Sequence, residues 1–283
     1  DIEMERAKAN TRVSEVHCPA DFAPDEGLSG DRETATAQSA AECLRRNGVT
    51  VVHGDRLLPL VYVEMIRRTG ISVEYDPDLG VIDRRQKTEE EVAYLREAQG
   101  VTEEAIELVC RMIGRADTDS EGILIYEGQR LSSEYLRLVV DRFFMERNYS
   151  GRPAIIAGGP PAADCHNLGW GDLKTSQPVI VDIFPANRST RYCGDCTRTV
   201  VHGDIPNEVL RMHAAVAEAK KNSIEVTKAG VTGQTVHEAT IKTLAAHGYD
   251  SGLPTEDDPD TYCAMTCGTG HGIGLEVHEP PLL

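Results

Sequence analysis

Two aspartates and two histidines in this chain have the types and spacing of residues that could hold a metal ion. Asp182 ends a short run of β-branched residues, and Asp195 lies within Tyr192-Cys-Gly-Asp-Cys-Thr-Arg-Thr199. His271 and His278 stand in a glycine-rich segment near the end of the sequence. Carboxylate oxygens and imidazole nitrogens suit divalent cations, and glycines let a backbone come close to a small ligand. We therefore predict a metal site that contains Asp182, Asp195 and His271.

The two aspartates are predicted to lie on neighbouring strands. Residues 179–184 and 192–201 have strand-like patterns, and the polar stretch 185–191 between them suits the loop of a hairpin. On such a hairpin Asp182 and Asp195 can approach each other across the ladder. Two carboxylates in contact would raise the pKa of one of them steeply unless a cation intervenes.

Two other interpretations of these residues stay open. Each aspartate could pair with an arginine, with Arg198 as the obvious partner, although two aspartates and a histidine-rich segment together favour a metal. A redox or zinc site could use the thiols of Cys193, Cys196, Cys263 and Cys267. Residues three apart on a strand point to opposite faces, however, which makes ligation shared by Cys193 and Cys196 awkward.

The rest of the sequence predicts two domains, the second being the larger. The 283 residues are 40% hydrophobic, which is enough to bury a large core. Helices and short strands alternate before residue 82, which predicts a small α/β domain over residues 1–81. The predicted elements of this domain are helices at 35–47 and 59–69 and strands at 49–53 and 71–75.

A long helix is predicted to begin the second domain, which spans residues 82–283. Thr88 suits its N-cap, the glutamates that follow suit the positive end of the helix dipole, and the apolar face runs to about Gly114. Further helices are predicted at 129–147, 206–229 and 235–247, and a further strand at 153–157. The whole chain therefore falls in the α+β class.

Charge and composition exclude several classes of partner. A net charge of −17 disfavours nucleic acid, because the phosphates would be repelled. No apolar run approaches the ~20 residues that span a bilayer, so we expect no membrane association. Eight cysteines without a secretion signal are more simply explained as free thiols than as disulfides. We therefore expect a cytoplasmic protein.

The order of these motifs resembles the pita-bread metallopeptidase family, which comprises methionine aminopeptidases, aminopeptidase P, prolidase and creatinase. The matching motifs are Asp182, Tyr192-x-x-Asp195-x-Thr-Arg-Thr199 and Gly270-His271-Gly-Ile-Gly-Leu-x-Val-His278-Glu. The pattern Arg-x-x-Lys-x-x-x-Glu within residues 82–98, together with the small preceding domain, resembles the aminopeptidase P and prolidase branch. The resemblance implies a pita-bread fold over residues 82–283.

The resemblance also implies roles for individual residues. Asp182 would be a terminal metal ligand, Asp195 would bridge two divalent ions, and His271 would bind one of them. His278 would stabilise charge that develops on the substrate carbonyl, and His166 matches the substrate-facing histidine of the family. Manganese is the metal that the resemblance favours, with cobalt, zinc or iron as alternatives. Cys267 stands where many family members have another histidine.

The implied function is hydrolysis of the bond between an N-terminal residue and proline, by an Xaa-Pro aminopeptidase or dipeptidase. Its substrate would be a peptide with proline in the second position, and a homo-oligomer such as a dimer is expected. Two alternatives are a creatinase-like amidinohydrolase without metals, which the presence of both aspartates argues against, and a non-catalytic pita-bread module that binds other proteins.

The family's two glutamate ligands follow the His-Glu-Pro-Pro segment, and this sequence ends at Leu283 before either position. The two negative charges of Asp182 and Asp195 would balance only half of the four positive charges of two divalent cations. We therefore expect the domain to lack its C-terminal strands, and the chain to be a fragment of a longer protein or to be inactive alone.

Overall fold

The computed structural model describes residues 2–259 and 261–283. The chain divides into two compact units, Asp1–Ile82 and Asp83–Leu283, which are described separately below. This division falls one residue from the boundary that the sequence suggested between residues 81 and 82. The interpretation of the first unit as a domain of its own stays a prediction.

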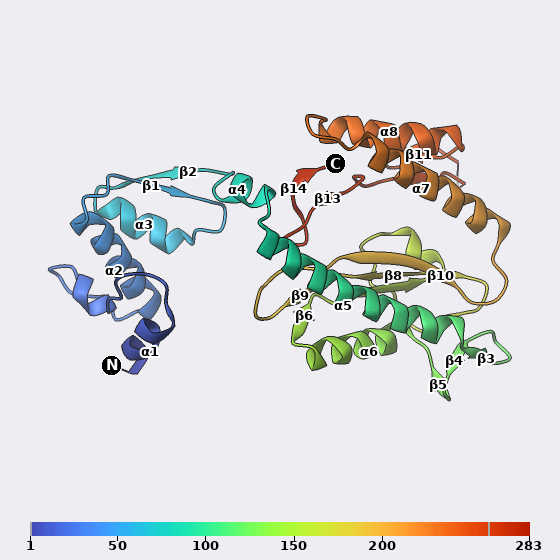
Figure 1. Cartoon of the computed structure of the whole chain (residues 1–283), viewed down its shortest axis with the longest axis horizontal. Helices are drawn as coiled ribbons and strands as arrows, with labels where there is room; N and C mark the ends of the chain where they lie inside the picture. The colour runs from blue at the N-terminus through green and yellow to red at the C-terminus, as the bar shows by residue number, and fades with distance from the viewer. Residues whose placement is uncertain (1, 260) are drawn as a thin grey trace. The chain divides into compact units, whose positions relative to one another are not determined.

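The first unit is a small α/β structure (Figure 1). Its elements are α1 (Ile2–Asn10), a 3-10 helix (Pro19–Phe22), α2 (Arg32–Arg46), β1 (Val51–Gly54), α3 (Leu60–Arg68) and β2 (Ser72–Tyr75), and α4 (Val81–Arg85) spans its end. Strands β1 and β2 pair in parallel, and α3 connects them. The two predicted helices and two predicted strands are confirmed, with ends shifted by a few residues.

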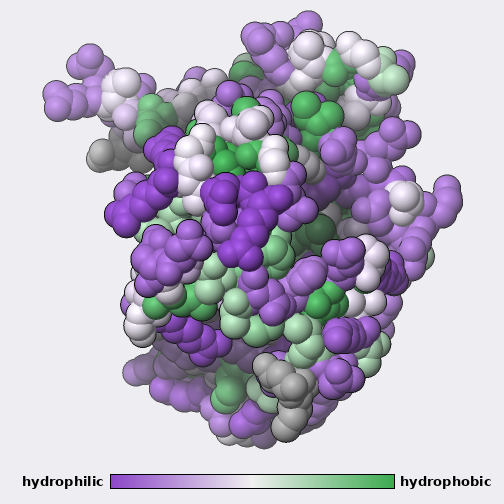
Figure 2. Space-filling view, turned by 90° about the vertical axis from the view of Figure 1, so that its left-hand side faces the viewer, coloured by the Kyte–Doolittle hydropathy of each residue, from purple (hydrophilic) through white to green (hydrophobic). Residues whose placement is uncertain are grey.

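The core of the first unit lies between α2, α3 and β2. Ala37 and Ala41 of α2 are buried against Met65 and Ile66 of α3, together with Ile71. Polar and apolar side chains alternate over the side shown in Figure 2, without one continuous apolar area. This small core stabilises the unit, although several large apolar side chains of the unit, Leu57 and Leu60 among them, are exposed.

The second unit begins with α5, the longest helix of the chain's described part, and continues with a series of short strands and three more helices (Figure 1). Its elements are α5 (Glu89–Gly114), β3 (Asp117–Thr118), β4 (Leu124–Tyr126), β5 (Gln129–Arg130), α6 (Ser133–Glu146), β6 (Tyr149–Gly151), β7 (Ile155–Gly158), a second 3-10 helix (Pro160–Ala163), β8 (Pro178–Ile183), β9 (Pro185–Asn187), β10 (Cys196–Val201), α7 (Asn207–Val226), α8 (Gly233–Ala246), β11 (Asp250–Ser251), β12 (Ala264–Met265), β13 (His271–Gly272) and β14 (Glu279–Leu282).

Helix α5 begins and ends where the sequence predicted. The Thr88 hydroxyl accepts a hydrogen bond from the Glu91 backbone N–H at 3.3 Å, and the Glu91 carboxylate accepts one from the Thr88 N–H at 2.7 Å. This reciprocal capping box satisfies two N–H groups that have no partner within the helix. Gly114 is the last helical residue. The helix does not extend back to residue 82, because α4 is a separate short helix.

The central sheet has strand order β10-β8-β7, with both pairs antiparallel. Helices α5 and α6 pack along this sheet in Figure 1. Val179, Val181 and Ile183 of β8 are buried in the core beneath these helices. Because successive side chains of a strand point to opposite faces, Asp182 lies on the other face of the sheet. The alternation within β8 therefore separates the core from the candidate site.

Three details of the predicted elements are wrong. The helix predicted at 129–147 begins only after its N-cap Ser132, because residues 129–130 pair with β4 across a turn with positive φ angles at Glu127 and Gly128. Residues 185–191 are not a simple loop, since Pro185–Asn187 forms β9 and pairs with β6. The second strand of the predicted hairpin starts at Cys196, so residues 192–195 precede it.

None of the helices in the described ranges 2–259 and 261–283 is both long enough and apolar enough to cross a membrane.

Gly194 allows the segment before β10 to lie directly on α5. A Cβ added at Gly194 would overlap the Thr102 hydroxyl and would lie 2.6 Å from the Ala98 carbonyl oxygen. We expect Gly194→Ala to lower the free energy of unfolding by about 1–3 kcal/mol, the usual cost of overpacking. Chemical denaturation followed by circular dichroism measures this change.

Gly100→Ala is the matched control, since Gly100 lies within α5 and nothing lies within 4 Å of an added Cβ. This variant should raise the free energy of unfolding by up to about 1 kcal/mol through helix propensity. Equal stabilities of the two variants would contradict the close approach at Gly194.

Candidate metal centre

Asp182 lies near the end of the central strand β8, between β7 and β10. Its neighbours across the ladders are Ile155 on β7 and Thr197 on β10. The Thr197 hydroxyl donates a hydrogen bond of 2.6 Å to Asp182 Oδ1. Asp182 is therefore opposite Thr197 and not opposite Asp195, which lies just outside the strand.

Asp195 is positioned by the segment that runs over the N-terminal half of α5. The Tyr192 hydroxyl donates to Glu91 Oε1 at 2.7 Å, and the Asp195 backbone N–H donates to Gln99 Oε1 at 3.1 Å. Burial and the neighbouring Glu91 carboxylate raise the pKa of Tyr192 to about 12, so its hydroxyl remains a donor at neutral pH. Two side chains of one helix thus fix the backbone on either side of Gly194.

His271 reaches Asp195 from a C-terminal hairpin formed by β13 and β14. The Cys193 backbone N–H donates to the Gly274 carbonyl at 2.9 Å, which ties this hairpin to the segment that carries Asp195. His271 Nε2 consequently lies 3.3 Å from Asp195 Oδ2. The His278 ring packs edge-on against the His271 ring, with the centroids 4.3 Å apart. Two aspartates and two histidines distant in sequence therefore meet.

The two carboxylates are partly withdrawn from water and lie close enough to affect each other. Burial raises the pKa of Asp182, and the Thr197 hydroxyl and the two histidines oppose this shift. Burial also raises the pKa of Asp195, and the Asp182 charge adds to that increase. Each carboxylate is thus costly to ionise without a cation nearby.

The arginine alternative finds no support in the part of the chain that the structure describes. The ion pairs there give neither aspartate an arginine partner, and Asp195 pairs with His271 instead. The Arg198 guanidinium donates to the Thr197 carbonyl at 2.8 Å.

The four-thiol alternative fails as well. All eight cysteines are free thiols, as predicted, and Cys193 and Cys196 are buried. Among the described residues, no group of ligand atoms that lie within 4.8 Å of one another contains these two cysteines.

The arrangement of Asp182, Asp195 and His271 is open. Their ligand atoms do not all lie within 4.8 Å of one another in the described structure. Their chemistry nevertheless fits a divalent cation, because two carboxylates and one imidazole offer oxygen and nitrogen donors of the kind such ions take.

His166 lies on an exposed loop between the 3-10 helix Pro160–Ala163 and β8. Its backbone N–H donates to Asp164 Oδ1 at 2.9 Å. The buried Arg137 of α6 holds the following residues by donating to the carbonyls of Leu168 and Gly169. The loop therefore has a fixed base, while the predicted substrate-facing role of His166 stays a prediction.

Glu279 is a residue of this region that the sequence reasoning missed. Its side chain is only 3% exposed, with Oε2 2.8 Å from Lys87 Nζ and Oε1 3.7 Å from the Arg84 guanidinium. Oε1 also accepts the backbone N–H of Leu275 at 3.0 Å, and a Cβ at Gly274 would collide with the carboxylate. Both oxygens are thus engaged, so Glu279 acts as a structural anchor although it adjoins His278.

A partial signal for this anchor exists in the sequence. Lys87 belongs to the Arg-x-x-Lys pattern and Glu279 to the His-Glu-Pro segment, but a contact between residues 192 positions apart leaves no local trace.

The chain belongs to metallopeptidase family M24, whose sequence profile matches residues 93–283. Among curated relatives, the Xaa-Pro dipeptidase of Pyrococcus furiosus is 28% identical over 186 residues, which are 64% of this chain and 49% of that protein. A probable dipeptidase PepE of Mycobacterium tuberculosis is 32% identical over 131 residues, 46% of this chain and 31% of the relative. The chain thus spans about half the length, or less, of these curated relatives.

Solved structures show the fold. Prolidase from Pyrococcus furiosus superposes with a TM-score of 0.72 at 19% identity, covering 100% of this chain and 71% of that one. An X-Pro aminopeptidase from Thermotoga maritima gives a TM-score of 0.69 at 21% identity, covering 90% and 65%. The predicted α+β pita-bread fold is therefore confirmed.

We expect Glu279→Gln to lower the free energy of unfolding by about 3 kcal/mol, because it leaves the Lys87 ammonium buried without its counter-charge. Adding Lys87→Met should restore part of that loss, since the double variant removes both charges. Urea denaturation of the single and double variants measures the coupling. Glu276→Gln, an exposed position of the same turn, should change stability by no more than about 0.5 kcal/mol. Equal effects at Glu276 and Glu279 would contradict the anchor.

Proposed function

We propose that Asp182, Asp195 and His271 hold two divalent cations, with Asp195 shared between them. The observation that carries this proposal is the meeting of two partly buried carboxylates with raised pKa values and no arginine partner in the described structure. Bound cations would offset the free-energy cost of ionising both carboxylates. His271 Nε2, 3.3 Å from Asp195, would turn to a cation as a neutral ligand.

The family resemblance favours manganese, with cobalt, zinc or iron as alternatives. Carboxylates suit the harder ions, whereas imidazole also suits zinc, cobalt and iron. The two carboxylates balance only two of the four positive charges of such a pair. Further oxygen donors would therefore complete the site, as the two glutamates expected after the His-Glu-Pro-Pro segment would do.

Peptide hydrolysis follows from what these side chains can do. When bound, the cations supply Lewis acidity that polarises a carbonyl and lowers the pKa of water. The exposed His278 ring can donate an N–H to the oxygen on which charge develops, and its edge-on contact with His271 limits its rotation. His166, on its anchored loop, can donate to the bound peptide.

The proposed substrate is a peptide with proline in the second position. Relatives named Xaa-Pro dipeptidase and X-Pro aminopeptidase support this class, and both activities fit the site. We place the enzyme in the cytoplasm as a homo-oligomer such as a dimer, acting on neither nucleic acid nor membranes.

The test uses the protein at the length found by intact-mass measurement in its natural source. We expect hydrolysis of Xaa-Pro dipeptides or Xaa-Pro-initiated peptides in the presence of Mn²⁺, and loss of activity after chelation. Asp195→Asn should lower kcat/KM by more than about 100-fold, the upper range for losing even an outer-shell partner of a metal ligand.

Asp204→Asn, at an exposed position after β10, is the control that should keep full activity. A protein that binds Mn²⁺ without cleaving any proline-containing peptide, or an active Asp195→Asn variant, would overturn the proposal. The first outcome would favour a protein-interaction module, and metal-independent cleavage of creatine would favour an amidinohydrolase.

A further inference from the structure

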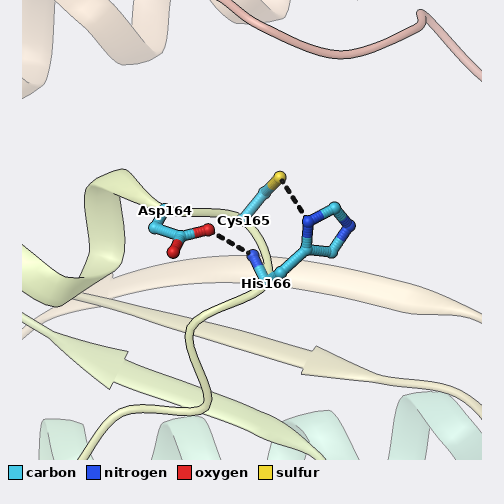
Figure 3. Close-up of side chains that lie close together, drawn as sticks. All are labelled: Asp164, Cys165 and His166. Carbon is cyan, nitrogen blue, oxygen red and sulfur yellow. Dashed lines mark hydrogen bonds between the residues drawn. The ribbon is translucent and has the colours of Figure 1, made fainter.

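Three consecutive residues of the loop before β8 bring different metal-binding groups together. Asp164, Cys165 and His166 have ligand atoms within 4.8 Å of one another, and no other group of three or more histidine, cysteine, aspartate or glutamate side chains in the described ranges meets this criterion. Figure 3 shows the Cys165 thiol directed at the His166 ring and the Asp164 carboxylate directed at the His166 backbone.

The distances suit a small tetrahedral cation. Cys165 Sγ lies 3.8 Å from His166 Nδ1. Zinc bonds of about 2.3 Å to sulfur and 2.0–2.1 Å to nitrogen at a tetrahedral angle place these two atoms about 3.5 Å apart. The pair is therefore within a few tenths of an ångström of the spacing for shared ligation. Asp164 uses Oδ1 to accept the His166 N–H, which leaves Oδ2 for a cation.

The surroundings of the loop leave the three side chains accessible. All three residues are exposed, so an ion has an open path to them.

We propose that Asp164, Cys165 and His166 form a second cation site, selective for thiophilic divalent ions of the Zn²⁺ class. It is chemically distinct from the Asp182–Asp195–His271 centre, which offers only oxygen and nitrogen donors. Thiolate ligation favours zinc and disfavours manganese. The two sites are therefore expected to prefer different cations, with the softer, thiophilic ions at the site that contains Cys165.

Binding at this site requires one proton release and no oxidation. The Cys165 thiol loses its proton to solvent and binds as a thiolate, while neutral His166 binds through Nδ1 and keeps its other proton on Nε2. His166 is then held against its own loop and withdrawn from a substrate. Inhibition by Zn²⁺ follows from this step, and that consequence alone rests on the proposed function of His166.

Cobalt is the probe, because Co²⁺ bound to a thiolate shows ligand-to-metal charge-transfer absorption that oxygen and nitrogen donors do not give. We expect Co²⁺ titration of the whole chain to produce this absorption, and added Zn²⁺ to remove it by competition. Cys165→Ser should abolish the band, and His166→Ala should weaken Co²⁺ binding at least tenfold, within the range seen for loss of a supporting ligand interaction.

Two matched variants separate this site from others. Cys263→Ser, a partly buried cysteine of the same unit, and Asp195→Asn, in the other centre, should both keep the band. A band that survives Cys165→Ser, or one that Asp195→Asn removes, would overturn the proposal. Because the absorption needs no turnover, its outcome is independent of whether the protein cleaves Xaa-Pro peptides.

Discussion

The buried charge of Glu279 is the interaction on which the arrangement of the candidate centre depends. Its carboxylate meets Lys87 and Arg84 just before α5 and also accepts backbone N–H groups of the turn that follows His271. A buried carboxylate needs such compensation, and the ionic contact fixes the hairpin in one position relative to the helix. His271 and His278 flank that turn, so their positions follow from this one pairing.

Helix α5 supports the other half of the centre as well. Glu91 and Gln99 hold the segment around Asp195, and the capping box that starts the helix uses the same Glu91 side chain. The central sheet positions the other aspartate. Strand β8 places Asp182 on the face opposite to its buried valines. The candidate ligands thus come from three separate segments, and α5 contacts the one that carries Asp195.

Most elements could be predicted from the sequence, because period-two and period-3.6 patterns and helix caps such as Thr88 are local signals. The sequence also pointed to Asp182, Asp195 and His271, which lie near one another in the structure, while their role as metal ligands stays a prediction. The register that places Asp182 opposite Thr197, with Asp195 just outside the strand, has no local signal in the sequence. Strand β9 was read as a loop because its partner, β6, lies far earlier in the chain. The glycines near His271 were expected to admit a ligand, yet Gly274 admits the Glu279 carboxylate.

The separation of Lys87 and Glu279 along the chain has a consequence for biosynthesis. Their contact joins residues 192 positions apart, so it closes almost the whole second unit in one loop. During synthesis on the ribosome, α5 and the central sheet can form while Arg84 and Lys87 are still solvated and not yet paired with Glu279. The part of the candidate centre that depends on this contact is therefore completed late, after residue 279 has emerged. A nascent chain that ends before Glu279 would carry both aspartates but would lack this contact.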